Sequence, residues 1–395
     1  MTNKILNLDF SNTEIAFRSK NNSELRTSYY LFKAIGINWL VKMGPPMVEL
    51  AFNLHLPIKG LIKKTVYQQF VGGESINDCE KAIDTLYKFN IGTILDYSVE
   101  GKEEENDFEH TCDETILTIE KAAQNPKIPF CVFKVTGLAR FALLEKVTAN
   151  QTLTTEEETE YGRVKARINK ICKIAFDKNV RIFIDAEETW IQTAIDNLAH
   201  EMMEKFNKQE AIVFNTIQLY RHDRLVFLKE SHQEAKVNNY YLGLKLVRGA
   251  YMEKERKRAQ ELNYTDPIQP TKETSDKDYD NALRYCIENI DTISICAGTH
   301  NETSSKLLAE LMLAKNIPNN DRRIYFSQLY GMSDNLSYNL ADAGYNVAKY
   351  LPYGPVKSVL PYLFRRAAEN TSVKGQTGRE LKLILQERTR RSKIK

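Results

Sequence analysis

The sequence predicts a (β/α)8 barrel of the TIM type, preceded by a helical segment. Three observations support this fold class. Eight short runs rich in β-branched residues follow residue 90, polar or amphipathic stretches of helix length separate them, and polar residues stand at the end of nearly every run. Repeated strand–helix units build a parallel sheet, and eight of them close into a barrel.

The eight runs have the length and composition of buried strands. They are GTILDYSV (92–99), FCVFKVTG (130–137), VRIFIDAE (180–187), AIVFNTIQLY (211–220), LGLKLVRG (242–249), ISICAGTH (293–300), RIYFSQLYG (323–331) and NVAKYLPYG (346–354). The rival architecture is a doubly wound sheet that binds a dinucleotide. No GxGxxG follows the first run or occurs elsewhere in the sequence, so we favour the barrel.

The regions outside the strands predict helices and surface segments. Residues 24–90 read as helical, with stops at Gly44-Pro45-Pro46 and Gly72-Gly73. Residues 150–160 read as a surface insertion with a capping residue before the next helix. We expect an N-terminal helical segment over 1–90, a barrel over 91–370, and a C-terminal helix and basic tail over 371–395, of which QERTRRSKIK is frayed and solvated.

Length and composition exclude several classes of protein. The chain has 395 residues, 42% of them hydrophobic, and a formal net charge of +3, which gives no reason to expect a nucleic acid partner. Six scattered cysteines without a CxxC pair argue against a zinc site or a disulfide framework and fit a reducing compartment. No signal pattern begins the chain, and no uncharged apolar run approaches the ~20 residues of a membrane span. We therefore expect a cytoplasmic protein.

Polar residues end the predicted strands, where a barrel carries its active site. A single such residue is more often a strand-end cap, but residues at nearly every end favour a polar mouth that binds a ligand. The basic residues Lys134, Lys245, Arg248, Arg365 and Arg366 outnumber the acidic residues expected to face this mouth, so the ligand should carry a carboxylate, a phosphate or both. The strand-end residues are Asp96, Lys134, Asp185, Glu187, Glu188, Gln218, Lys245, Arg248, Thr299, His300, Asn301, Gln328 and Tyr350.

Arg365 and Arg366 are the sharpest feature of the sequence. They follow apolar residues in a helix that Pro355 can open, so at least one of them should face the interior. Two guanidinium groups can clamp the two oxygens of one carboxylate. No cluster of His, Asp and Glu has metal-ligand spacing, so we expect no metal. No Ser or Cys stands beside a suitable His base, which disfavours a hydrolytic triad.

Eight stretches of the sequence resemble the proline dehydrogenase family, in the order of that family. They are DYSVEG (96–101), FKVTGL (133–138), IDAEE (184–188), the glutamine of NTIQLY (215–220), KLVRGAY (245–251), THN (299–301), LYGMSD (329–334) and YLPYGPV…PYLFRRAAEN (350–370). The resemblance implies a monofunctional, FAD-dependent enzyme. It would oxidise L-proline to Δ1-pyrroline-5-carboxylate by transferring a hydride from proline C5 to flavin N5, as the first step of proline catabolism.

The resemblance also implies roles for individual residues. Lys134, Arg365 and Arg366 would bind the substrate carboxylate, and Leu329 and Tyr350 would wall the proline ring. Asp185 would position the basic groups, and Lys245 stands where the family places a basic residue against flavin N5, an arginine in some members. The implied cofactor-binding residues are Ala186, Gln218, Lys245, Arg248, Gly249, Ala250, Tyr251, Thr299, His300 and Asn301.

The electron acceptor implied by the resemblance is a membrane quinone. Apolar stretches flanked by Lys42, Lys59, Lys63 and Lys64 could lie on a membrane surface, although a helical layer covering the barrel is the interpretation we favour. Peripheral attachment to the inner face of the cytoplasmic membrane stays an alternative to a purely cytoplasmic location. Two other functions stay open: a hydroxyproline or other cyclic amino-acid dehydrogenase of the same fold, and a flavin-free barrel that acts as a binding protein.

Overall fold

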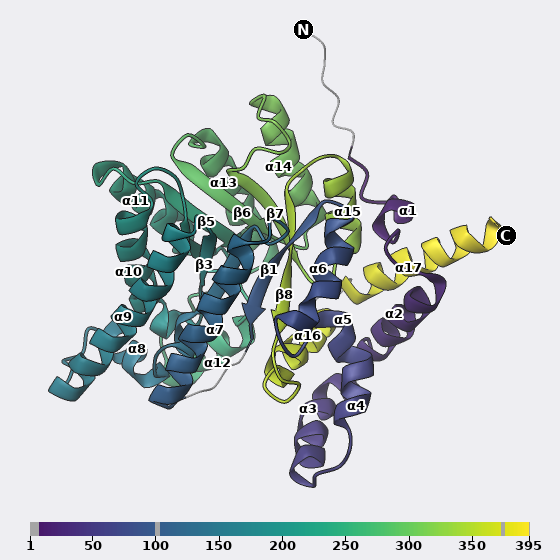
Figure 1. Cartoon of the computed structure of the whole chain (residues 1–395), viewed down its shortest axis with the longest axis horizontal. Coiled ribbons are helices and arrows are strands. Elements are labelled where there is room, and N and C mark those ends of the chain that lie inside the picture. The colour runs from purple at the N-terminus through teal and green to yellow at the C-terminus, as the bar shows by residue number, and fades with distance from the viewer. Residues whose placement is uncertain (1–7, 99–102, 373–375, 395) are drawn as a thin grey trace. The chain divides into compact units, whose positions relative to one another are not determined.

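The computed structural model describes residues 8–98, 103–372 and 376–394 and contains all eight predicted strands (Figure 1). The strands form a closed parallel barrel in chain order, which confirms the predicted fold class. The observed strands are β1 (Ile91–Tyr97), β2 (Phe130–Lys134), β3 (Arg181–Asp185), β4 (Val213–Gln218), β5 (Leu242–Val247), β6 (Ile293–Gly298), β7 (Ile324–Leu329) and β8 (Val347–Tyr353).

The strand register brings the polar strand-end residues into rows. Lys134 of β2 pairs with Asp185 of β3, and Thr216 of β4 pairs with Lys245 of β5. Most observed strands end two or three residues before the predicted runs do, because the last polar residues of those runs leave the sheet and begin the following loops. Side chains at these positions are therefore carried by loops that start from a rigid barrel.

The chain divides into two compact units. Among the described residues, unit 1 comprises residues 103–327, and unit 2 comprises residues 8–98, 328–372 and 376–394. The described helices of unit 1 are α7 (Glu105–Ala123), α8 (Phe141–Thr148), α9 (Thr155–Asp177), α10 (Thr189–Phe206), α11 (Arg224–Val237), α12 (Met252–Leu262), α13 (Lys272–Glu288) and α14 (Glu302–Ala314). The side chain of Thr154 caps α9 together with Glu157, which confirms the capping signal in the 150–160 segment.

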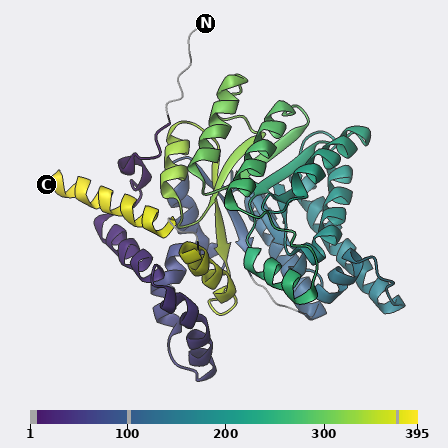
Figure 2. The same ribbon diagram turned by 180° about the vertical axis from the view of Figure 1, so that it is seen from behind.

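Unit 2 contains the N-terminal and C-terminal helices. They are α1 (Thr13–Ala16), α2 (Asn22–Ile35), α3 (Asn38–Asn53), α4 (Lys59–Ile62), α5 (Gln68–Phe70), α6 (Glu80–Tyr87), α15 (Asp334–Asp342), α16 (Leu360–Ser372) and α17 (Gln376–Lys393). A π-helix over Lys63–Tyr67 joins α4 to α5. Helix α17 lies along α2 in both ribbon views (Figures 1 and 2), and Leu25, Phe32 and Ile384 are buried in the core that these helices share with α16.

Two predictions about helix ends in unit 2 are wrong. The helix does not stop at Gly44-Pro45-Pro46, because α3 runs through both prolines. Each proline removes one N–H from the helix ladder, and the partly exposed position of Pro45 and Pro46 lets water reach the carbonyls that lose their partners. The helix with the arginine pair begins at Leu360 and not at Pro355, because residues 355–359 form turns first.

The C-terminal residues are helical and docked, which also differs from the sequence-based expectation. Glu387 of α17 is fully buried and accepts hydrogen bonds from Arg390 and Arg391. Arg391 also donates to the backbone carbonyls of Phe17 and Lys20. The predicted frayed tail is therefore an ordered helix up to Lys393, whereas the predicted domain boundaries stay a prediction.

Within the described ranges, no helix is long and apolar enough to cross a membrane. All six cysteines are buried and unbridged, as their scattered spacing predicts.

Candidate active site

Three of the predicted residues, carried by β2, β3 and β5, meet in unit 1. Nζ of Lys134 lies 3.3 Å from Oδ2 of Asp185, and Lys245 donates a hydrogen bond to Oδ1 of the same carboxylate. Lys245 also lies over the ring of Phe183, with Nζ 5.2 Å from the centroid. The side chains of Asp185 and Lys245 are almost completely buried. One carboxylate thus holds two ammonium groups in place, and the trio keeps a net positive charge.

Glu187 forms a second anchor beside this trio. Its carboxylate accepts hydrogen bonds from the backbone N–H and the hydroxyl of Thr136, which joins the loops after β2 and β3. Burial raises the pKa of Glu187 to about 7, and the two hydrogen bonds from Thr136 oppose this rise only in part. The group therefore changes its charge near neutral pH.

Gln218 presents a buried acceptor at the end of β4. Its side-chain N–H donates to the backbone carbonyl of Glu187 at 3.0 Å. That bond fixes the amide plane, and Oε1 has no hydrogen-bond partner among the described residues although the side chain is 2% exposed. A buried polar atom of this kind normally has a partner, so the position is suited to a ligand N–H.

Arg248 is held rigidly where the loop after β5 begins. Its guanidinium donates to Asp276 of α13 at 2.6 Å, to Thr299 at 2.8 Å and to Ser304 of α14 at 2.9 Å. It also stacks 4.3 Å above the ring of Tyr279. These contacts tie the ends of β5 and β6 to the helices behind them.

The loop after β5 passes close to a neighbouring ring. Gly249 has a φ of +137°, and a Cβ atom there would lie 2.4 Å from the ring of Tyr220. Only glycine fits this position. Ala250 is exposed and Tyr251 is half-buried just before α12, and Ala186 is half-buried after β3.

The residues after β6 prepare the start of α14. Asn301 caps this helix by accepting hydrogen bonds from the N–H groups of Thr303 and Ser304, and its own N–H donates to the hydroxyl of Thr299. His300 between them is half-buried. The end of β6 and a helix N-terminus thus coincide with Arg248, an arrangement that favours an anionic group such as a phosphate.

The predicted ring-wall residues and the arginine pair lie in unit 2. Tyr350 of β8 is 8% exposed, and its carbonyl accepts a hydrogen bond from the N–H of Tyr330 at 2.9 Å. Leu329 packs against the core of unit 2. Arg366 of α16 is 6% exposed and lies over the ring of Tyr362, whereas Arg365 is half-buried. The expectation that at least one arginine faces inward is met by Arg366.

Several residues of these clusters could not be identified as site residues from the sequence. Thr136, Asp276 and Ser304 complete the hydrogen bonds of Glu187 and Arg248, but Asp276 and Ser304 belong to helices whose inward face only the folded chain defines. No group of three His, Cys, Asp or Glu residues in the described ranges could hold a metal ion.

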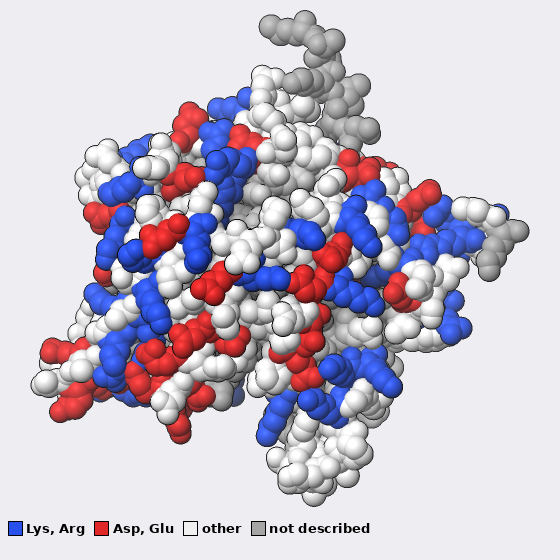
Figure 3. All heavy atoms as spheres, in the orientation of Figure 1, with Lys and Arg blue, Asp and Glu red and all other residues white. Residues whose placement is uncertain are grey.

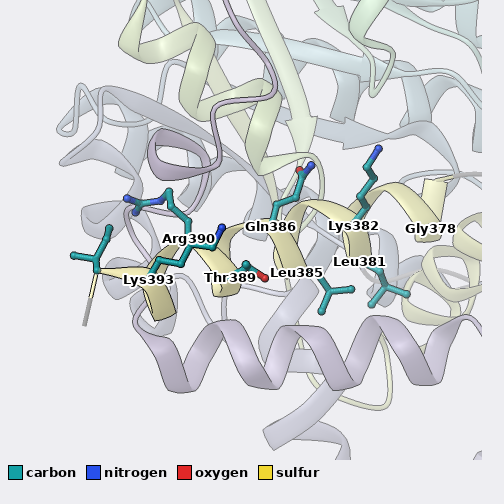
Figure 4. Close-up of a pocket in the computed structure, with 9 residues that line it drawn as sticks. Gly378, Leu381, Lys382, Leu385, Gln386, Thr389, Arg390 and Lys393 are labelled. Atoms are coloured by element: carbon teal, nitrogen blue, oxygen red, sulfur yellow. The ribbon is translucent and has the colours of Figure 1, made fainter.

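A hollow of about 780 Å³ runs along α17 and contains none of the predicted site residues (Figure 4). It is lined by an apolar strip and by polar side chains that point in different directions, and we place no ligand in it. The lining residues are Gly378, Leu381, Lys382, Leu385, Gln386, Thr389, Arg390, Lys393 and Ile394.

The fold and these clusters define a barrel enzyme with a cation-rich site at the carboxyl ends of its strands. The family model for proline dehydrogenase matches residues 79–379, which is most of the chain. The chain therefore belongs to the proline dehydrogenase family, a family of oxidoreductases that act on proline.

Individual relatives agree with this assignment. The chain is 32% identical to proline dehydrogenase 1 of Dictyostelium discoideum over 98% of its own length and 76% of that protein. It is 34% identical to the carbapenem antibiotics biosynthesis protein CarD of Pectobacterium carotovorum over 84% of this chain and 86% of the relative. Human proline dehydrogenase 1 is 41% identical over 60% of this chain and 40% of the human protein.

A solved structure shares the fold. The proline utilization A protein of Bdellovibrio bacteriovorus, in a form inactivated by N-propargylglycine, superposes with a TM-score of 0.72 at 21% sequence identity. The match covers 94% of this chain and only 40% of that protein.

Proposed function

We propose that this protein is an FAD-dependent proline dehydrogenase that oxidises L-proline to Δ1-pyrroline-5-carboxylate. Family membership supports the substrate and the reaction class. The observation that carries the proposal is the trio of Lys134, Asp185 and Lys245, because it supplies a fixed positive charge on three apolar strands of the barrel. Such a charge suits both a substrate carboxylate and a reduced, anionic flavin.

The residues that we propose for FAD fit the chemistry of that group. The unpartnered Oε1 of Gln218 would accept a hydrogen bond from the flavin's pyrimidine edge. The loop at Gly249, which packs against the ring of Tyr220, would run along the ribityl chain and the pyrophosphate. Arg248 with Thr299 and the start of α14 would face the pyrophosphate. When bound, FAD would take the hydride that leaves proline C5.

The protein's own task in this reaction is orientation and charge. Lys134, Arg365 and Arg366 would hold the carboxylate of proline, so that the ring carbon next to the nitrogen faces the oxidant. Asp185 would keep both lysines of the trio in one arrangement by its two oxygens. Lys245, which donates a hydrogen bond to that carboxylate, would stabilise developing negative charge.

We propose a membrane quinone as the acceptor that reoxidises the flavin, with α3 as the contact to the lipid surface. Trp39, Met43, Met47, Leu50 and Leu54 follow one another at helical spacing and are each 50–61% exposed. The opposite face of α3 is apolar too, since Val48 and Phe52 pack against the core of unit 2. A helix that is apolar on both faces is unusual at a water-exposed surface and suits the boundary of a bilayer.

Basic residues flank this apolar face, as Figure 3 shows for the white end of unit 2. Lys59, Lys63 and Lys64 are exposed just beyond it. Lys59 and Lys63 also form ion pairs with Glu74, which reduces the charge that they can offer to anionic lipid. The side chain of Lys42 lies outside the described residues. This arrangement supports a cytoplasmic protein that attaches peripherally to the inner face of the membrane.

One experiment tests the reaction directly. The purified protein should be yellow, and its flavin absorption should bleach when L-proline is added without oxygen. A protein that takes up no FAD on reconstitution would contradict the cofactor and favour a binding protein of the same fold. Bleaching by hydroxyproline but not by proline would reassign the substrate and leave the cofactor in place.

A further inference from the structure

Lys349 is a lysine in the wall of the barrel whose side chain is completely buried. It belongs to β8, directly before Tyr350. Successive residues of a strand point to opposite faces, so the two side chains leave β8 in opposite directions. A buried ammonium group is costly unless several acceptors surround it, and its surroundings therefore matter.

The acceptors around Lys349 all come from one loop. Nζ donates to the backbone carbonyl of Met332 and to Oδ1 of Asp334 at 2.9 Å, and it lies 3.5 Å from the carbonyl of Leu329. An ammonium group has three N–H donors. All three of its directions are thus used on residues 329–334, the loop that follows β7.

The same loop is fixed from two further sides. Gln69 donates to the carbonyl of Gly331 at 2.8 Å, and Glu380 of α17 accepts from the N–H of Ser333 at 2.7 Å. Gly331 and Ser333 both have positive φ values, +76° and +48°. A loop with two left-handed residues keeps its shape only where its surroundings hold it.

Asp334 connects Lys349 to the N-terminal segment. Its second oxygen, Oδ2, lies 2.9 Å from Nζ of Lys20. Burial alone would raise the pKa of Asp334, but the ammonium groups of Lys20 and Lys349 outweigh this effect and lower it. The carboxylate is therefore ionised and bound to both lysines. Residues far apart in sequence, Lys20, Lys349 and Glu380, thus converge on one short loop.

We propose that Lys349 is a positioning residue that sets the selectivity of the enzyme for the substrate ring, because it fixes the loop carrying Leu329 against the strand carrying Tyr350. This inference rests on the proposed function, in which Leu329 and Tyr350 wall the proline ring. Tyr330 already ties the two elements by donating to the carbonyl of Tyr350 at 2.9 Å. Lys349 adds the contacts that hold the rest of the loop, with Lys20 and Glu380 as more distant supports.

The test compares two substrates in four proteins. Lys349→Met removes the central contact, Lys20→Met removes only the outer partner of Asp334, and Arg18→Met is the control. Arg18 forms an exposed ion pair with Asp342, at the far end of α15 from Asp334. L-Proline and trans-4-hydroxy-L-proline differ only on the ring, so their ratio of kcat/KM reports on the ring wall.

We expect Lys349→Met to lower kcat/KM for L-proline on the order of tenfold, mainly through KM, while the preference for proline over hydroxyproline shrinks at least about threefold. Lys20→Met should produce a smaller change in the same direction, and Arg18→Met none. A general loss of stability would lower kcat/KM for both substrates by the same factor. If each lysine variant lowered kcat/KM for the two substrates by the same factor, or changed neither value, the inference would be overturned. Lys20→Met keeps the test valid if Lys349→Met does not fold.

Hydrogen–deuterium exchange separates this inference from the proposed function. The amides of residues 330–334 should exchange faster in Lys20→Met and Lys349→Met than in the wild type or in Arg18→Met. If the wild type does not oxidise proline, the proposed function fails, and the exchange rates still decide whether Lys349 holds the loop. Unchanged exchange in both lysine variants would show that Lys349 does not hold the loop.

Discussion

The ammonium group of Lys134 lies 3.3 Å from the carboxylate of Asp185, across the register of two neighbouring parallel strands. The second oxygen of Asp185 binds Lys245, so a single carboxylate contacts both lysines. The charge of the site and its geometry therefore depend on the same residue.

Asp185→Asn should lower kcat/KM for L-proline by about ten- to a hundredfold, since charge-assisted hydrogen bonds contribute roughly 1.5–3 kcal/mol. The side-chain volume is kept, so flavin content should stay near normal. Steady-state kinetics and the flavin-to-protein absorbance ratio measure the two effects. Asp177→Asn is a matched control, because Asp177 forms an exposed pair with Lys173 on α9. Wild-type kinetics in Asp185→Asn would refute the role of the trio.

Gln218→Leu should weaken FAD binding by about tenfold, because it replaces the unpartnered buried acceptor with an apolar group of similar size. Equilibrium dialysis of FAD against the apoprotein measures this directly. Gln124→Leu, at an exposed position after α7, serves as the control. Unchanged FAD affinity would place the flavin ring elsewhere.

Arg365→Met and Arg366→Met should each raise KM for L-proline about ten- to a hundredfold, while FAD content stays near normal. Arg366 is the more buried of the two, so its replacement should have the larger effect. Substrate titrations of the bleaching reaction and steady-state rates give the same comparison independently. If both variants kept the wild-type kcat/KM, the carboxylate clamp would be wrong.

Glu187 should make the stability of the protein depend on pH. Its pKa is about 7 in the folded protein and close to 4.5 in the unfolded chain, so the folded state binds the proton more tightly. Stability should therefore fall as the pH rises from about 4.5 to about 7, by roughly 2–3 kcal/mol in total.

Glu187→Gln isolates this effect, because the amide keeps an acceptor for Thr136 and does not titrate in this range. Urea unfolding of both proteins between pH 5 and pH 8 should show the variant gaining stability relative to the wild type as the pH rises. If the free energy of unfolding changed with pH in the same way in both proteins, Glu187 would titrate at its ordinary pKa in the folded protein.

Replacing Met47 and Leu50 together by serine should weaken binding to anionic liposomes at least about tenfold, because each apolar side chain contributes up to roughly 1.5–3 kcal/mol when buried. Leu117→Ser, an exposed leucine of α7, is the control for a general loss of apolar surface. Sedimentation with liposomes measures the binding, which should also weaken as salt screens Lys59, Lys63 and Lys64. If the double substitution left liposome binding unchanged, α3 would not be the membrane contact.

The sequence predicts the barrel well because its signal is periodic and local. Each β-branched run identifies a strand, and Lys134, Asp185 and Gln218 can be recognised because each follows apolar residues near the end of such a run. Asp276, Ser304 and Lys349 could not be recognised in this way. Their importance comes from partners distant in sequence, and a lysine within a strand ordinarily indicates a solvent-facing position.

The course of α3 could not be predicted for a different reason. A Gly-Pro-Pro sequence usually ends a helix, because each proline lacks the N–H that continues it. In α3 the residues on either side stay helical, and Val48 and Phe52 are packed against the core of unit 2. Tertiary packing thus overrides the local preference at Pro45 and Pro46.

The contact between Ser333 and Glu380 also has a consequence for biosynthesis. The two residues are 47 positions apart, and Glu380 belongs to the helix that follows the arginine pair. At about 5–20 residues per second, a ribosome needs roughly 2–10 s to extend the chain from one to the other. During that interval the loop carrying Leu329 has left the peptidyl-transferase centre without one of its supports. The loop that carries Leu329, which we propose as part of the ring wall, is thus among the last parts of the protein to gain all its contacts, and a nascent chain can complete most of its strands before this loop is fully supported.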